Sequence, residues 1–189
     1  TTAGLIWFAL TSSNNGLCNA ETDTVIVTFD SAPIVSAGLD IITCQSDTAF
    51  LFATLNGGGT VLWETTNGLG SFTPDSISNP TGYIPVAGDT TAPVEVIVTY
   101  INGCGNITDT VLITVLPSPG LRMNYIVNCE TFEVQFEAIT SGGTIQTVLW
   151  DFDDSSTNTT ASPLHEYDIA GNYDVTLFVL TTDGCTDSV

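Results

Sequence analysis

The sequence predicts an all-β protein built from tandem β-sandwich domains. Short runs rich in Val, Ile, Thr and aromatic residues alternate with turns rich in Gly, Pro and Asn, and no stretch of useful length has a helical period. One hairpin motif, with a cysteine in its turn, recurs at Cys18, Cys104 and Cys185, at intervals of about 80 to 90 residues. A hairpin that repeats at this interval indicates an array of similar domains.

The repeat sets the expected domain boundaries. Residues 1–33 correspond to the C-terminal part of a truncated domain, residues 34–117 to a complete sandwich, and residues 118–189 to a domain that lacks its last strand. Proline-containing stretches at 31–38 and 117–120 are typical of short, stiff linkers. We therefore expect the sequence to be a window cut from a longer protein.

In the middle domain, residues 48–54 are apolar on both faces, which predicts a strand covered on two sides. A glycine turn at 56–59 leads to a strand at 61–65 that carries Trp63, and the hairpin at 94–115 closes the domain.

In the last domain, the strand at 132–138 alternates between apolar and polar side chains, which predicts one buried and one wet face. Two sheets that enclose a tryptophan near a cystine follow the plan of an immunoglobulin-like sandwich. The residues expected to face inward are Phe132, Val134, Phe136, Ala138, Val148, Trp150, Phe152, Tyr173, Val175, Leu177 and Val179.

The repeats also suggest how the cysteines are used. Each of the two later domains has one cysteine early and one in its closing hairpin, so we expect the disulfides Cys44–Cys104 and Cys129–Cys185. Truncation then leaves Cys18 without a partner. The alternative is five free thiols in a reducing compartment, whereas disulfides would place the chain outside the cytoplasm.

The composition narrows the range of functions. The chain has 21 acidic residues against one base, Arg122, while 43% of its residues are hydrophobic. Phosphate binding needs clustered Lys and Arg, so nucleic acid is excluded as a partner. No run of 18 apolar residues is present, so we expect no membrane insertion of this segment. The apolar fraction predicts buried cores rather than a disordered acidic tail.

Three spaced blocks in the last domain carry a family resemblance: Trp150-Asp-Phe-Asp-Asp, Pro163-Leu-His-Glu-Tyr and Gly171-Asn-Tyr-Asp-Val. Together they resemble the PKD domain (polycystic-kidney-disease type), whose pattern is Trp-Asp-Phe-Gly-Asp-Gly, Asn-Pro-x-His-x-Tyr and Gly-x-Tyr-x-Val. Here Asp153 and Ser155 occupy the two glycine positions and Ser162 replaces Asn. Because Asp tolerates a left-handed backbone, we expect the turn to survive.

The middle domain resembles the PKD-like repeats of very large secreted bacterial surface proteins, including gliding-motility adhesins, at residues 35–40, Cys44, Trp63 and residues 103–106. The resemblance implies a non-enzymatic stalk or filament segment of a cell-surface adhesin, exported by the type 9 route. Its implied partners are neighbouring repeats of the same chain and lateral copies in a filament, with an unidentified surface glycan or protein as ligand. The alternatives are a spacer or carbohydrate-binding module of an extracellular hydrolase, and a lattice protein of a surface layer or sheath.

Three groups of residues are candidates for chemistry. His165 could act as a base, but the PKD pattern gives His-x-Tyr a structural role and no nucleophile accompanies it, so we expect no catalytic site. Trp63 and Trp150 could stack on sugars, but both lie on the strand where sandwiches bury a tryptophan.

The densest acid cluster, Asp151, Asp153 and Asp154, is a weak calcium candidate, because calcium needs six or more oxygens and no further acidic anchor follows. A solvated turn is the favoured alternative, so we expect no cofactor.

Asp-Thr or Asp-Ser followed by an apolar residue or threonine occurs six times and resembles the O-glycosylation acceptor pattern of the bacteria that make such adhesins. The alternative is that Asp ends a turn and Thr begins a strand. That alternative explains residues 75–77 and 89–91 poorly, because these lie in loops. The expected glycosylation sites are Ser76 and Thr90 first, then Thr48, Thr24 and Thr110, and also Ser188.

Overall fold

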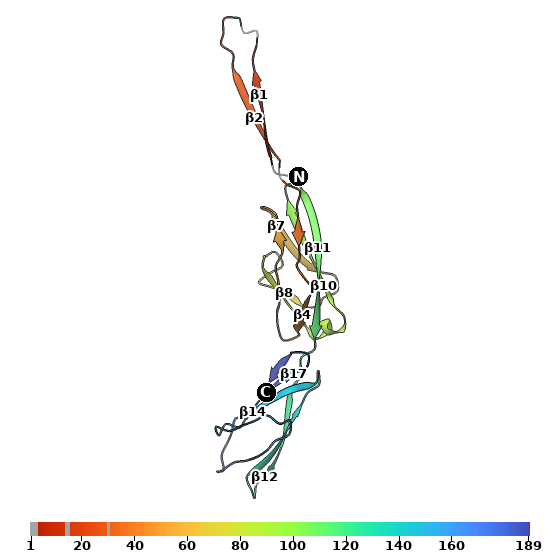
Figure 1. The fold of residues 1–189 in the computed structure, drawn as a ribbon, viewed down its shortest axis with the longest axis vertical. Coiled ribbons are helices and arrows are strands. Elements are labelled where there is room, and N and C mark those ends of the chain that lie inside the picture. Colours follow the sequence, from red (N-terminus) through yellow and green to blue (C-terminus); the bar gives the residue numbers. More distant parts are fainter. Residues whose placement is uncertain (1–3, 14–15, 30) are drawn as a thin grey trace.

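The computed structural model describes all residues except 1–3, 14–15 and 30. Figure 1 shows an elongated molecule in which a β-hairpin, a middle unit (residues 34–117) and a last unit (residues 118–189) follow one another along one axis. The described regular structure is β-strand apart from a short 3-10 helix, η1 (Ala87–Thr91). The predicted all-β fold is therefore confirmed.

The N-terminal hairpin consists of β1 (Gly4–Thr11) and β2 (Thr22–Phe29), which pair antiparallel along their full length. Their aromatic and β-branched residues favour the extended backbone. Neither strand pairs with another sheet among the described residues, and Trp7 is 74% exposed. The hairpin expected here is present, with its apolar side chains facing solvent.

The middle unit is a two-layer sandwich. In the sheet β4-β11-β10-β7, β4 runs parallel to β11 and the other neighbours are antiparallel. The other layer contains the pair β3-β6 and the sheet β5-β9-β8. The strands are β3 (Val35–Ser36), β4 (Ile41–Cys44), β5 (Ala49–Leu51), β6 (Thr54–Leu55), β7 (Thr60–Thr65), β8 (Ser71–Thr73), β9 (Thr81–Ile84), β10 (Val94–Asn102) and β11 (Gly105–Leu116).

The core of the middle unit comes from alternate residues of both layers. On β10, Val96, Val98 and Tyr100 are fully buried. Trp63 of β7 is also buried, as expected, and its indole N–H donates to the carbonyl oxygen of Ser78 at 3.1 Å. This tryptophan belongs to the core and is not a sugar platform.

The strand around β5 differs from the prediction of two covered faces. Ala49 and Leu51 are buried, but Phe50 and Phe52 are 80% and 62% exposed. The described residues cover only the inner face of this sheet, so the prediction is wrong for the outer face.

The last unit repeats the two-layer plan with the sheets β12-β13-β16 and β15-β14-β17-β18. Val134, Phe136, Val148, Trp150, Phe152, Leu177 and Val179 are buried as predicted, with Ala138, Tyr173 and Val175 half-buried against them. The strands are β12 (Arg122–Asn128), β13 (Glu133–Ile139), β14 (Ile145–Asp151), β15 (Thr157–Asn158), β16 (Leu164–Glu166), β17 (Thr176–Thr181) and β18 (Thr186–Ser188).

Phe132 is the exception among the inward-facing predictions. It precedes β13, is 45% exposed, and has a left-handed backbone with φ of 55°. A left-handed residue interrupts the alternation of a strand, so the inward direction extrapolated from Val134 and Phe136 does not reach Phe132.

Equivalent aspartates accept hydrogen bonds from the first residues of the middle unit and of the last unit. Asp109 accepts a hydrogen bond from the backbone N–H of Ala37 at 2.8 Å, and Asp187 accepts one from the N–H of Leu121 at 2.9 Å. Both belong to the Asp-Thr-Val or Asp-Ser-Val motif of a closing hairpin. The sequence repeat is therefore also a repeat of hydrogen bonding.

The linker between the units is held by the last unit. The backbone N–H groups of Ser141 and Gly142 donate to the carbonyl oxygen of Pro119 at 2.9 and 3.0 Å, and Pro119 is itself buried. Among the described residues, no sheet contains strands of both units. The linker is thus ordered by hydrogen bonds in addition to the stiffness of its prolines.

Candidate functional site

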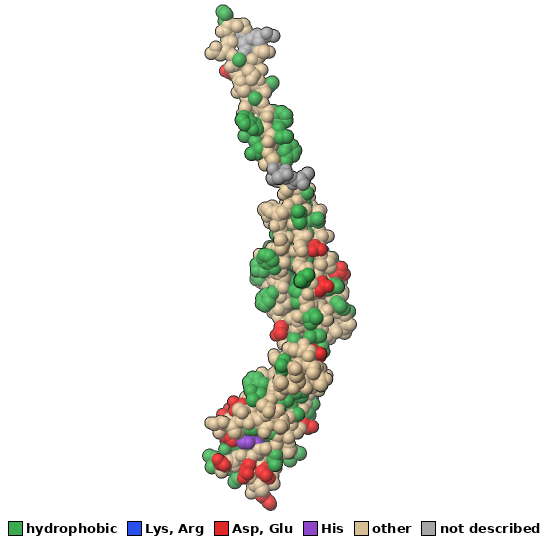
Figure 2. All heavy atoms as spheres, in the orientation of Figure 1, with side chains coloured by type: hydrophobic (Ala, Val, Ile, Leu, Met, Phe, Trp, Pro, Cys, Tyr) green, Lys and Arg blue, Asp and Glu red, His purple; other side chains and the backbone are tan. Residues whose placement is uncertain are grey.

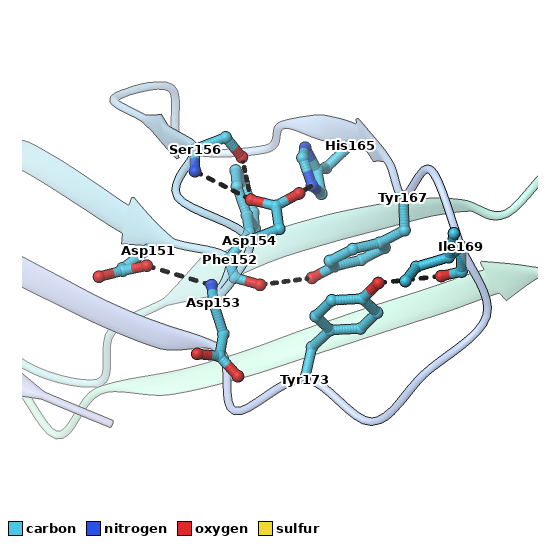
Figure 3. A network of polar contacts seen from close by, with 9 residues as sticks. All are labelled: Asp151, Phe152, Asp153, Asp154, Ser156, His165, Tyr167, Ile169 and Tyr173. Atoms are coloured by element: carbon cyan, nitrogen blue, oxygen red, sulfur yellow. Dashed lines mark hydrogen bonds and ion pairs between the residues drawn. The ribbon is translucent and has the colours of Figure 1, made fainter.

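The three sequence blocks of the last unit meet in one aromatic cluster (Figure 3). The rings of Phe152 and His165 are stacked with centroids 4.0 Å apart, and the rings of His165 and Tyr167 are nearly perpendicular with centroids 4.5 Å apart. Tyr167 stacks in turn on Tyr173 at 4.0 Å. The block residues therefore form a continuous series of ring contacts that links the end of β14 to the segment before β17.

Two tyrosine hydroxyls close this cluster. Tyr167 donates to the carbonyl oxygen of Phe152 at 3.2 Å, and Tyr173 donates to that of Ile169 at 2.9 Å. Burial, followed by the nearby charge of Asp154, raises the pKa of Tyr167 to about 12. The hydroxyl therefore stays protonated and remains a donor at physiological pH.

The acidic turn holds its carboxylates in local hydrogen bonds. Asp151 accepts from the N–H of Asp153 at 3.1 Å, and Asp153 accepts from the N–H of Asp174 at 3.0 Å. Asp153 and Ser155 have φ of 62° and 73°, so the residues at the family's glycine positions adopt the left-handed turn as expected.

Asp154 lies between Ser156 and His165. Its Oδ1 accepts from both the N–H and the hydroxyl of Ser156, and its Oδ2 lies 2.7 Å from Nε2 of His165. The hydrogen bond from the Ser156 hydroxyl is the main reason that the pKa of Asp154 is lowered. The hydroxyl of Ser156 donates to the carboxylate of Asp154 and not to the imidazole of His165. Ser156 and His165 are therefore not arranged as a nucleophile and its base.

The structure does not assemble the three acids into a metal site. Among the described residues, no group of three or more His, Cys, Asp or Glu side chains is arranged to hold an ion. Asp151, Asp153 and Asp154 each face a different hydrogen-bond donor instead.

The indole N–H of Trp150 donates to the carbonyl oxygen of Thr160 at 2.9 Å, as that of Trp63 does to Ser78. Trp150 is fully buried, so neither of these two tryptophans offers a face to a sugar.

Sequence reasoning missed a buried acid in the middle unit, Asp89. Its side chain is 3% exposed and accepts hydrogen bonds from the N–H groups of Leu69 and Val86, at 2.7 and 3.0 Å. The hydroxyl of Tyr83 donates to it at 2.9 Å, and burial raises the pKa of Tyr83 to about 12. The Asp-Thr-Thr motif drew attention to Thr90 as a glycan acceptor, whereas the aspartate itself fastens the loop before β10.

All six glycosylation candidates retain some exposure. Thr24, Thr110 and Ser188 are exposed, while Ser76, Thr90 and Thr48 are half-buried. The hydroxyl of Thr90 donates to the carbonyl oxygen of Ala87 at 2.9 Å within η1. Attachment of a glycan there would have to break this bond.

The cysteine pairing differs from the expected one. A single disulfide among the described residues joins Cys44 to Cys185, and its two ends lie in different units. Cys18 and Cys129 are exposed thiols, and Cys104 is exposed in the turn between β10 and β11. The predicted bonds Cys44–Cys104 and Cys129–Cys185 are therefore wrong, although both Cys44 and Cys185 do form a disulfide.

Strand register explains the error in the middle unit. Cys44 pairs with Leu116, at the end of β11, whereas Cys104 precedes its first residue, Gly105. At about 3.3 Å per residue, the strand separates the two cysteines by about 36 Å, well beyond the reach of a disulfide.

In the last unit, β12 likewise separates Cys129 from Leu121, the residue bonded to Asp187 near Cys185. The early cysteine and the hairpin cysteine lie at opposite ends of one sandwich. They approach each other only across the junction between two sandwiches.

The fold and the junction define a tandem array of β-sandwiches joined by a covalent bond. Residues 122–189 match the family described as the PKD domain. The match, together with the sandwich topology, supports PKD-type, immunoglobulin-like repeats.

A segment of 44 residues is 48% identical to a microbial collagenase of Vibrio alginolyticus. The aligned part is 23% of this chain and 5% of the collagenase.

Solved structures with similarity include domains A168–A170 of titin (10% identity, TM-score 0.43, 96% of this chain and 71% of that one). Bovine butyrophilin is similar at 13% identity and a TM-score of 0.34, over 84% of this chain and 97% of that one. The described residues include no helix with the length and apolar character needed to span a bilayer.

Proposed function

We propose that this chain is a non-catalytic structural segment of a large secreted bacterial surface protein, where it forms part of a stalk or filament. The observation that carries the proposal is the Cys44–Cys185 bond, which joins two consecutive sandwiches end to end. A stalk needs units that keep their relative positions under load. A covalent bond and an ordered linker supply that constraint.

The surface fits this role. The formal net charge of −20 discourages nonspecific clumping of chains, and the single basic residue leaves few cleavage sites for trypsin-like proteases. Figure 2 shows acidic side chains spread over the middle and last units on this face. An extracellular setting is supported by the disulfide and the PKD match.

We further propose an adhesin of the gliding-motility type, exported by the type 9 route and O-glycosylated. These finer points rest on the resemblance of the middle unit to repeats of such proteins. The proposed partners are neighbouring repeats of the same chain, lateral copies in a filament, and a surface glycan or protein as adhesive ligand.

A second candidate is a spacer of an extracellular hydrolase, which the 44-residue similarity to a collagenase favours. The two functions place the chain differently: a stalk stays on the cell, whereas such a spacer accompanies a catalytic domain.

Immunogold labelling of native cells with antibodies against residues 34–189 tests the choice. We expect label on extended structures at the cell surface. Unlabelled cells, with the antigen co-purifying with peptidase activity from the medium, would overturn the stalk and support the hydrolase spacer. A strain that lacks the segment, labelled and fractionated in the same way, is the control for antibody specificity.

A further inference from the structure

The position of the disulfide determines which part of the chain carries tension. In sequence, Cys44 ends β4 early in the middle unit, and Cys185 lies in the turn before β18 late in the last unit. The two residues are 141 positions apart in sequence, yet their Cα atoms are 5.7 Å apart. The bond is therefore a covalent shortcut around most of both units.

Tension applied to the two ends of a chain is carried along the shortest covalent path between them. Here that path runs from the hairpin along β3 and β4 to Cys44, crosses the sulfur–sulfur bond to Cys185, and leaves through β18. The backbone from β5 to β17 lies inside the closed loop and is not on this path. Both core tryptophans, Trp63 and Trp150, lie within that loop.

The segments on the path are already extended. β3 and β4 are strands, and β4 pairs in parallel with the last residues of β11, from Ile113 to Leu116. The backbone N–H of Gln45 continues this contact by donating to the carbonyl oxygen of Leu116 at 2.9 Å. Such segments yield little length when pulled, because a strand is close to the maximum span of its residues.

The anchor on the last unit is rigid. Cys185 is 1% exposed, and its carbonyl oxygen accepts hydrogen bonds from both the N–H and the hydroxyl of Thr181, at 2.9 and 3.2 Å. Its own N–H donates back to that hydroxyl at 3.2 Å. Tension that enters through the sulfur atom therefore reaches β18 through a residue that hydrogen bonds to Thr181 hold in place.

We propose that the Cys44–Cys185 bond is a mechanical bypass, which carries axial tension past the cores of two consecutive sandwiches so that force cannot unravel them. This inference deepens the proposed stalk function and takes its biological meaning from it. The force path itself depends only on where the bond lies. The labelling experiment can therefore overturn the stalk function while force spectroscopy upholds the bypass. Force spectroscopy can likewise overturn the bypass while labelling upholds the stalk.

Single-molecule force spectroscopy on the full 189-residue chain tests the bypass, with both ends tethered through enzymatically ligated peptide tags. At about 3.5 Å per residue, the 141-residue separation corresponds to about 500 Å of extended chain. We expect the oxidised chain, stretched fully, to be shorter than the reduced chain by that amount. Only the reduced chain should show the unfolding steps of the two cores.

Dithiothreitol added to an oxidised tether supplies the reduced state of the same folded molecule. The disulfide takes up two electrons and two protons to give two thiols, and the dithiol becomes a cyclic disulfide. Cys185→Ser should behave as the reduced protein does, and Cys129→Ser, which removes an exposed thiol, should behave as the oxidised wild type. If Cys185→Ser does not fold, reduction in the tether still decides the question. Equal stretched lengths before and after reduction would overturn the bypass.

Discussion

Replacing Asp89 with Ala should destabilise the middle unit more than replacement of any exposed acid. The carboxylate is buried and accepts three hydrogen bonds, two from backbone N–H groups and one from the hydroxyl of Tyr83. Alanine would leave these three donors without partners. At about 1 to 2 kcal/mol for each stranded donor, the free energy of unfolding should fall by about 4 kcal/mol.

The isosteric change Asp89→Asn separates charge from shape. The amide keeps one oxygen acceptor but turns its NH2 group toward other donors, so we expect the free energy of unfolding to fall by about 2 kcal/mol. Asp47→Asn is the matched control, because Asp47 is exposed in the same unit.

The destabilisation should also depend on pH. Burial alone would raise the pKa of Asp89, but the hydrogen bonds from Leu69, Val86 and Tyr83 outweigh it, and the pKa is lowered from its ordinary value of 3.8. The unfolded chain therefore binds the proton more tightly than the folded one. The stabilisation is fully present above the unfolded pKa and is lost as the pH falls through the lower, folded pKa. Asp89→Ala should remove this part of the acid lability.

Hydrogen exchange measured by mass spectrometry reports the opening free energy of the middle unit separately from that of the last unit. We expect faster exchange in β9 and β10 of Asp89→Ala, with the last unit unchanged. An opening free energy within about 0.5 kcal/mol of the Asp47→Asn control, the usual range for surface substitutions, would refute the role of the buried acid.

Three further predictions concern the rest of the chain. Non-reducing peptide mapping should recover a peptide that joins Cys44 to Cys185, and a peptide that joins Cys44 to the hairpin turn of its own unit would contradict the structure. Protein from the native host should exceed the mass of the bare polypeptide, with Ser76 and Thr90 modified first; a mass equal to that of the polypeptide would end the glycosylation hypothesis. Added calcium should raise the melting temperature only modestly, by screening the charge of −20. A large saturable shift at micromolar calcium that Asp154→Asn abolishes would show a specific site instead.

The parts of the fold that depend on local pattern could be predicted from the sequence. Alternation along β13 placed Val134 and Phe136 in the core. The strand position of Trp150 and the His-x-Tyr pattern around Tyr167 indicated that both are structural. The same rule failed at Phe132, because a single left-handed residue changes side-chain direction and leaves no mark in the hydrophobic pattern.

The features that depend on how units meet could not be predicted in this way. The early and hairpin cysteines were interpreted as equivalent across repeats, and pairing them within a unit ignored the length of the strands between them. Asp89 was missed for a related reason. Its donors come from Leu69 and Val86, in loops whose approach to one another is set by the packing of both layers.

The Cys44–Cys185 bond also makes oxidation a record of assembly. In the folded chain, Cys185 lies in the turn before β18 and Cys44 ends β4, so the bond holds the last unit against the end of the middle unit. Nearer cysteines in the sequence, Cys104 and Cys129, become available earlier in synthesis, but the folded strands hold them at distant ends. In a folded chain this one bond therefore marks the docking of the middle unit on the last unit, and its presence is a single chemical readout of that arrangement.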